Sequence, residues 1–288
     1  MSRSKTILLY AGVALTALAV FLYLRFPADL LKELISTQVS QSVPGVSIDI
    51  ENLSPNFPTG VVLTNIDLMY QNQNIFKAEE AKIAARLSTI VSEQKSFAYN
   101  CLTGGGTIKG RAIFRADDSG SGIDLSARFK SVQLKEIPAI KVFSGYDVAG
   151  ILDGSVNING SDQNSSSQAA FNISECTLKL IQPLFGLEKL NFQLIEVELD
   201  MRGQRVIIKK CDLNGDEVDG RITGSLTVRK PYGQTRLNLS GVLKPQPDFS
   251  AKLSQMIPVA LLSGTNIQRK GIPFKISGTI DSPGYSLR

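Results

Sequence analysis

The densest group of residues that could do chemistry is acidic and lies late in the chain. It consists of Asp212, Asn214, Asp216, Glu217 and Asp219. Their oxygen atoms are of the type that binds calcium, but a calcium loop counted from Asp212 fails at two positions. Glu217 stands where glycine is needed, and Thr223 stands where a bidentate glutamate is needed. A tight hairpin between Ile208 and Ile222 explains the same residues, because Asn-Gly and Asp favour turns. We expect no metal site here.

Other residue types that carry catalysis are missing or out of place. The chain has no histidine, so Ser-His-Asp and Cys-His mechanisms are excluded. Gly104-Gly105-Gly106 is not followed by Gly-Lys-Ser/Thr and precedes a predicted strand, which excludes a phosphate-binding loop. We therefore expect neither an enzyme nor a bound cofactor.

Three cysteines, Cys101, Cys176 and Cys211, stand far apart in the chain without any Cys-x-x-Cys pair. This spacing supports neither a redox motif nor a zinc ribbon. Two interpretations stay open: small apolar residues on strands, or one disulfide with one free thiol.

The elements that would position these residues begin with an apolar N-terminal segment. Residues 1–5 form a short polar start that contains Arg3 and Lys5, and residues 6–25 contain an uncharged run from Ile7 to Leu24. These 18 residues span about 27 Å as a helix, enough to cross a bilayer core. We expect an uncleaved single-pass anchor with a cytoplasmic N-terminus. The alternative is a signal peptide cleaved near Ala17-Leu18-Ala19, and both interpretations place the remaining chain outside the cytoplasm.

The net charge of +5 is small and its lysines and arginines are scattered. This suits a position near anionic lipid headgroups. Without a Lys/Arg run or a known binding signature, we expect no nucleic-acid partner.

Hydrophobic periodicity divides the body of the chain. Residues 27–43 repeat apolar side chains at helical spacing, which predicts an amphipathic helix that packs on its own domain or rests on the membrane surface. From residue 46 to 288 the period is two, which predicts roughly a dozen strands. Only 134–143 and 248–262 read as later helices, and each contains a proline.

A glycine-punctuated strand pattern occurs three times, starting at Gly106, Gly150 and Gly220. Each copy alternates apolar and polar residues, and strand glycines permit bulges and bends. One interpretation is a twisted antiparallel sheet with glycine bends. The other is a curled sheet with a partly open apolar side. The candidate groove residues are Ile108, Ala112, Phe114, Val156, Ile158, Ile222, Leu226 and Val228.

The order of these features resembles a known family. An anchor, a short helix, Gly45-Val-Ser-Ile-Asp-Ile-Glu-Asn-Leu-Ser and Phe57-Pro58 look like the opening of AsmA-like envelope proteins. Within that group the whole chain is most similar to type II secretion system protein N, through Ala149 to Gly154, Asp219 to Leu226 and Gly271 to Ile280. The resemblance implies a bacterial inner-membrane subunit with a periplasmic β-rich domain and no catalytic residues.

The sequence thus predicts a mainly β fold: a curled antiparallel sheet, forming a groove or flattened barrel, with one transmembrane helix and few short helices. The leading functional hypothesis is a structural and interaction subunit of the type II secretion system, with the inner membrane and other secretion subunits as partners. The alternative is an AsmA-like envelope protein that binds or transfers lipids through their acyl chains.

Overall fold

The structure is a computed structural model that describes residues 25–86, 94–117, 120–160, 166–184, 187–247, 249 and 271–287, together with positions 7, 9, 10, 12, 13, 17 and 21. Most of the expected anchor at 6–25 and all but Phe249 of the expected helix at 248–262 lie outside these residues. Among the described residues, no helix has both the length and the apolar character needed to cross a membrane.

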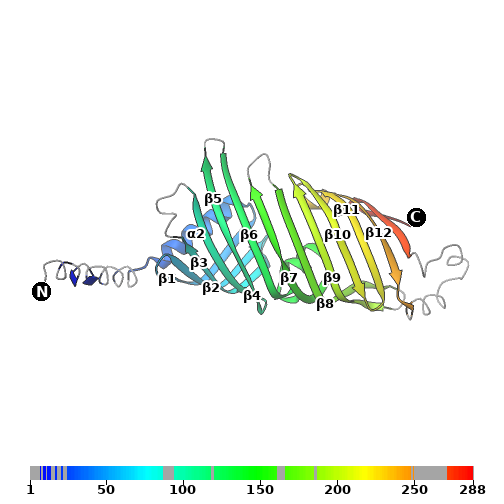
Figure 1. The fold of residues 1–288 in the computed structure, drawn as a ribbon, viewed down its shortest axis with the longest axis horizontal. Helices are drawn as coiled ribbons and strands as arrows, with labels where there is room; N and C mark the ends of the chain where they lie inside the picture. Colours follow the sequence, from blue (N-terminus) through cyan, green and yellow to red (C-terminus); the bar gives the residue numbers. More distant parts are fainter. Residues whose placement is uncertain are drawn as a thin grey trace, which may run out of the picture.

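Fourteen strands form one antiparallel sheet in which every strand pairs with its neighbours in sequence (Figure 1). The strands are β1 (Val46–Asn56), β2 (Gly60–Tyr70), β3 (Gln73–Ala85), β4 (Lys95–Thr103), β5 (Gly106–Asp117), β6 (Gly120–Gln133), β7 (Asp147–Gly160), β8 (Ser166–Leu184), β9 (Leu187–Arg202), β10 (Arg205–Gly215), β11 (Val218–Thr227), β12 (Arg236–Pro245), β13 (Ile272–Thr279) and β14 (Pro283–Leu287). The mainly β prediction is confirmed.

The sheet is open: among the described strands, β1 pairs with β2 and β14 pairs with β13, but β1 and β14 do not pair with each other and stand at its two ends (Figure 1). Of the two predicted forms of the curled sheet, a groove or a flattened barrel, the flattened barrel is therefore wrong. At about 4.8 Å per strand, β1 and β14 are separated by roughly 60 Å along the sheet.

Two carbonyl groups of β1 accept hydrogen bonds from side chains of the preceding helix: Lys32 Nζ donates to Glu51 O at 2.7 Å, and Ser36 Oγ donates to Ile48 O at 3.4 Å.

That helix, α2 (Ala28–Ser42), lies where the sequence predicts an amphipathic helix at 27–43. Its Leu31 and Ile35 pack against the main cluster of buried side chains, which belongs to the first three strands. The cluster consists of Ile50, Leu53, Leu63, Ile66 and Ala78. Leu30 and Leu34, on another side of the helix, are 64% exposed. The helix therefore packs on its own domain and also presents an outward apolar stripe.

A kink in the first three strands keeps this core on one face. Leu63 and Ile66 are three residues apart on β2, so regular alternation would place them on opposite faces. Asn65 between them has φ +49°, in the left-handed region, and its side-chain amide hydrogen-bonds to the Glu51 carboxylate on β1. The left-handed residue changes the alternation, and both side chains join the core.

Two short helices fill a gap between β3 and β7, where the strands between them stop short. The β4–β5 hairpin turns at Gly104 and Gly105. Because β3 begins at Gln73 but is paired with β4 only from Glu80 onward, the first residues of β3 extend past this hairpin. On the other side, β7 begins at Asp147 but is paired with β6 only from Ile151. The 3-10 helix η2 (Leu134–Glu136) and α3 (Pro138–Ser144) occupy this gap and contact β3 and β7.

The helix expected over 134–143 is thus divided into two. Ile137 adopts an extended conformation between η2 and α3, because the residue before a proline is disfavoured in the helical region. Pro138 then opens α3, where its missing N–H removes no helical hydrogen bond.

Candidate functional site: an apolar face shared by the strands

The strand register places seven of the eight predicted groove residues on one face of the sheet. On β5 and β7, Ala112 pairs with Leu125 and Leu125 pairs with Ile158, so these three side chains share a face. The same alternation includes Ile108 and Phe114 on β5, Val156 on β7, and Ile222 and Leu226 on β11. Val228 lies just beyond the last residue of β11.

A single row of paired residues links these strands across most of the sheet. Each member is opposite the next on the neighbouring strand, from β5 to β13, and every member is apolar or glycine. The row consists of Gly110, Ala127, Val156, Ala169, Leu199, Ile208, Gly224, Leu239 and Ile276. We call the face that contains this row the apolar face. It also carries Ile123, Leu125 and Phe129, which alternate with polar residues on β6.

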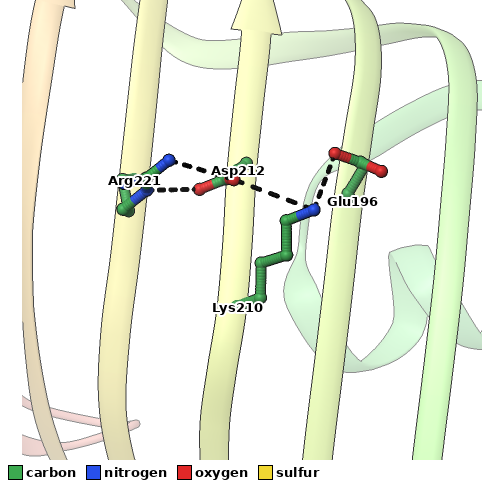
Figure 2. A network of polar contacts seen from close by, with 4 residues as sticks. All are labelled: Glu196, Lys210, Asp212 and Arg221. Carbon is green, nitrogen blue, oxygen red and sulfur yellow. Dashed lines mark hydrogen bonds and ion pairs between the residues drawn. The ribbon is translucent and has the colours of Figure 1, made fainter.

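The opposite face is polar, and its charged groups bridge neighbouring strands. Figure 2 shows one such network over β9, β10 and β11. Arg221 Nε donates to Asp212 Oδ1 at 2.7 Å, and Lys210 Nζ donates to Glu196 Oε2 at 2.9 Å and lies 3.9 Å from Asp212 Oδ2. The hydrogen bond from Arg221 lowers the pKa of Asp212. These bonds lie immediately after the register shifts of β10, which follow Ile208 on both the β9 and the β11 side.

The remaining carboxylates of the acidic cluster accept hydrogen bonds from separate partners. Asp216 accepts a hydrogen bond from Gln193, Glu217 accepts two from Asn191, and Asp219 accepts one from the backbone of Gly215. The turn at residues 216–217 joins β10 to β11, so the predicted hairpin is confirmed. The carboxylates support the hairpin and do not converge on a common point.

Aromatic side chains cover glycines on the apolar face. Gly154 on β7 pairs with Phe129 on β6 and with Phe171 on β8. Tyr99 similarly pairs with Gly110, and a Cβ atom on that glycine would lie 2.5 Å from the tyrosine hydroxyl oxygen. An aromatic ring thus fills the space that a glycine leaves in a strand, a known way to stabilise strand glycines.

The burial of side chains on the apolar face differs between the first strands and the later strands of the sheet. At the first strands, α2 and the core cluster bury side chains almost fully, with Leu53 at 3% exposure. In β10–β13, all of which the structure describes, no Val, Ile, Leu or Phe side chain is buried. Within the described part of the chain, the apolar face is therefore packed at one end and partly open over the later strands.

The three cysteines lie on different strands, β4, β8 and β10, and all have free thiols. Cys176 is buried, and the other two are half-buried. Burial raises the pKa of all three thiols, that of Cys101 to about 11. The disulfide interpretation is not what the structure shows, and these residues act as small apolar side chains.

Sequence reasoning missed the positions that hold the apolar face together across irregularities. Besides Asn65, the non-glycine residues Ser131 and Glu175 have φ of +53° and +51° and stand at register shifts in β6 and β8. The backbone N–H of Ser131 donates to Asp153 Oδ1 at 3.1 Å. The available signal was weak: an interruption of the apolar alternation at a polar residue.

Comparison with protein-family models, with curated proteins and with solved structures finds no match to this chain.

Proposed function

We propose that this chain is an AsmA-like envelope protein whose sheet binds the acyl chains of lipids along its apolar face. The observation that supports this proposal is the row of apolar and glycine positions from Gly110 to Ile276, together with the incomplete burial of β10–β13. A sheet with one apolar face must bury that face against another layer or a ligand. Each CH₂ group that leaves water contributes about 0.8 kcal/mol, so ten groups contribute roughly 8 kcal/mol before the cost of ordering the chain.

The membrane attachment is part of the same proposal. The apolar run from Ile7 to Leu24 supports a single-pass inner-membrane anchor with a cytoplasmic N-terminus and a periplasmic body. The exposed stripe of Leu30 and Leu34 on α2 favours a position at the membrane surface immediately after that anchor. An apolar face that starts beside the bilayer would receive acyl chains without carrying them far through water. The absence of histidine supports a role in binding without catalysis.

A matched pair of variants on β12 tests the proposal. Leu239 lies on the apolar face and Val242 lies on the opposite face, paired with Arg221. We expect Leu239→Asn in the full chain to reduce the lipid that co-purifies, measured by lipid extraction and mass spectrometry. Val242→Asn, which introduces the same group three positions away, should leave the lipid content unchanged. Wild-type protein without bound acyl lipid, or an equal loss in both variants, would contradict the proposal.

The ordered resemblance to type II secretion system protein N favours a second candidate, an interaction subunit of that secretion machine. Deleting the gene should then block secretion of folded proteins through the outer membrane, and the chain should co-purify with other secretion subunits. Unchanged secretion would contradict this candidate while leaving lipid binding untouched. Adjacency of the gene to those of a secretion ATPase, pseudopilins and a secretin would favour it.

A further inference from the structure

The gap between β3 and β7 contains a cavity that the apolar face alone does not explain. It has a volume of about 950 Å³, within the range of small-molecule sites. Its lining comes from η2, α3 and the starts of β3 and β7, together with Thr177 and Lys179 of β8. The apolar lining residues include Leu134, Ile137, Pro138, Ile140, Val142 and Val148.

The charged residues of this cavity are unbalanced. Lys135, Lys141 and Lys179 line it, against the single carboxylate of Asp147. Lys141 Nζ lies 2.8 Å from Asp147 Oδ1, and their hydrogen bond lowers the pKa of Asp147, so this carboxylate already has a partner. Lys135 Nζ lies 3.8 Å from the carboxylate of the exposed Glu136. The lining therefore carries a net positive charge.

The strand register is a second observation that favours an anion bound beside Lys179. Lys179 lies between Asp147 on β7 and Lys189 on β9, directly opposite both. Like charges at directly opposite positions destabilise a sheet. The repulsion between Lys179 and Lys189 would be relieved by an anion held at this end of β8. Gln73, Asn74 and Thr177 add uncharged polar groups to the same lining.

The apolar part of the cavity lies on the two short helices. Its lining there consists of Leu134 of η2, Ile137, and Pro138, Ile140 and Val142 of α3. Asp147 and Lys179 are paired and share one face of β7 and β8, whereas Val148 and Leu178 alternate to the other face. A ligand with an anionic end at the lysines and an apolar end against η2 and α3 would satisfy both parts of the lining.

We propose that this cavity binds the headgroup of an anionic phospholipid whose acyl chains begin against the apolar residues of η2 and α3. This inference rests on the proposed lipid-binding function and adds the class of lipid and the position of its headgroup. The lysines would pair with the phosphate, and the apolar residues of η2 and α3 would contact the start of the acyl chains.

Native mass spectrometry of the full chain in a nonionic detergent tests the proposal, with phosphatidylglycerol and phosphatidylcholine of identical acyl chains as probes. Wild-type protein should bind phosphatidylglycerol about fivefold or more in preference to phosphatidylcholine, because lysines favour anionic headgroups. The variant Lys135→Gln/Lys141→Gln/Lys179→Gln should lose this preference and keep its binding of phosphatidylcholine. The control variant Lys109→Gln/Lys130→Gln/Lys275→Gln removes the same charge from the polar face and should keep the preference.

The outcomes separate this inference from the proposed function. Equal binding of both lipids by wild type, or equal loss of preference in both triple variants, would overturn the headgroup site while lipid binding stands. Binding of neither lipid would overturn both proposals. Glycerol 3-phosphate that binds as tightly as phosphatidylglycerol would show a site for free anions and overturn the lipid assignment. Thermal unfolding followed by circular dichroism checks that both triple variants are folded.

Discussion

The rings of Phe129 and Phe171 meet edge to face with their centroids 5.7 Å apart, although their strands β6 and β8 are separated by β7. They meet because the residue between them on β7 is Gly154, which pairs with both. In a sheet, strands two apart are about 9.6 Å from each other, too far for most side chains to touch across an intervening side chain. The glycine lets two aromatic rings close over the backbone and continue the apolar face.

Replacing Gly154 with alanine should therefore destabilise the fold. A Cβ atom there would lie 2.4 Å from the Ala170 carbonyl oxygen and 2.6 Å from Phe171 Cδ1, so the backbone and the ring would both have to move. We expect a loss of about 1–3 kcal/mol in the free energy of unfolding, measured by urea denaturation. Gly284→Ala is the control, since its nearest atom would be 3.6 Å away. Equal stability of the two variants would contradict the packing argument.

Asn65 should resist replacement by a branched side chain for a different reason. Its φ of +49° suits asparagine and glycine, whereas a β-branched residue is strained there. Asn65→Val should lower the free energy of unfolding by about 1–2 kcal/mol, and near-ultraviolet circular dichroism should show altered packing of the core. Asn65→Gly keeps the backbone conformation and should lose less stability. Equal losses in the two variants would assign the effect to the hydrogen bond with Glu51, which both variants remove.

The regular parts of the apolar face follow from alternation in the sequence, and the irregular parts do not. Ala112, Val156 and Leu226 were assigned to one face because their strands alternate without interruption. Leu63 and Ile66 are three apart on one strand, and only the backbone conformation of Asn65 places them together. An alternating sequence pattern does not reveal this change of face, because the change depends on one residue and its partner across the sheet.

The cavity beside α3 could not be predicted for another reason. It exists because β3 and β7 extend past the short β4–β5 hairpin, which is a property of strand pairing. The sequence predicts a helical segment over 134–143, but the approach of Lys135 and Lys141 to Lys179 depends on the register of β7 and β8. The local residue pattern predicts the helical segment, whereas pairing between strands creates the cavity.

The bonds of Asp212 predict how the sheet responds to acid. Its pKa is lowered in the folded state, so the stabilisation is fully present above the ordinary pKa near 3.8 and is lost as the pH falls through the lower folded value. The wild type should therefore lose more stability between pH 5 and acid than Asp212→Asn, with a small difference because Arg221 is 73% exposed. Urea denaturation across this range measures it. At pH 7, Arg221→Gln and Asp212→Asn should lower the free energy of unfolding by similar amounts. The double variant should lose little more than either single variant, because each change removes the same pair. Additive losses would contradict the pairing.

Cys101 provides a native probe of the apolar face through its titration. Burial raises its thiol pKa to about 11 from an ordinary value of 9.0, because the thiolate is poorly solvated between the strands. The folded protein should therefore carry about a hundredfold less thiolate at this site at pH 8 than an exposed cysteine, and iodoacetamide should modify it correspondingly slowly. The rate should rise toward pH 11, and unfolding in urea at pH 8 should restore the ordinary rate. The same shift means that folding stability declines as the pH rises from about 9 toward 11, because only the unfolded chain readily ionises there. Mass spectrometry of the modified peptide measures the rate. Rapid modification of folded protein at pH 8 would show that Cys101 is exposed and that this part of the apolar face is open to water.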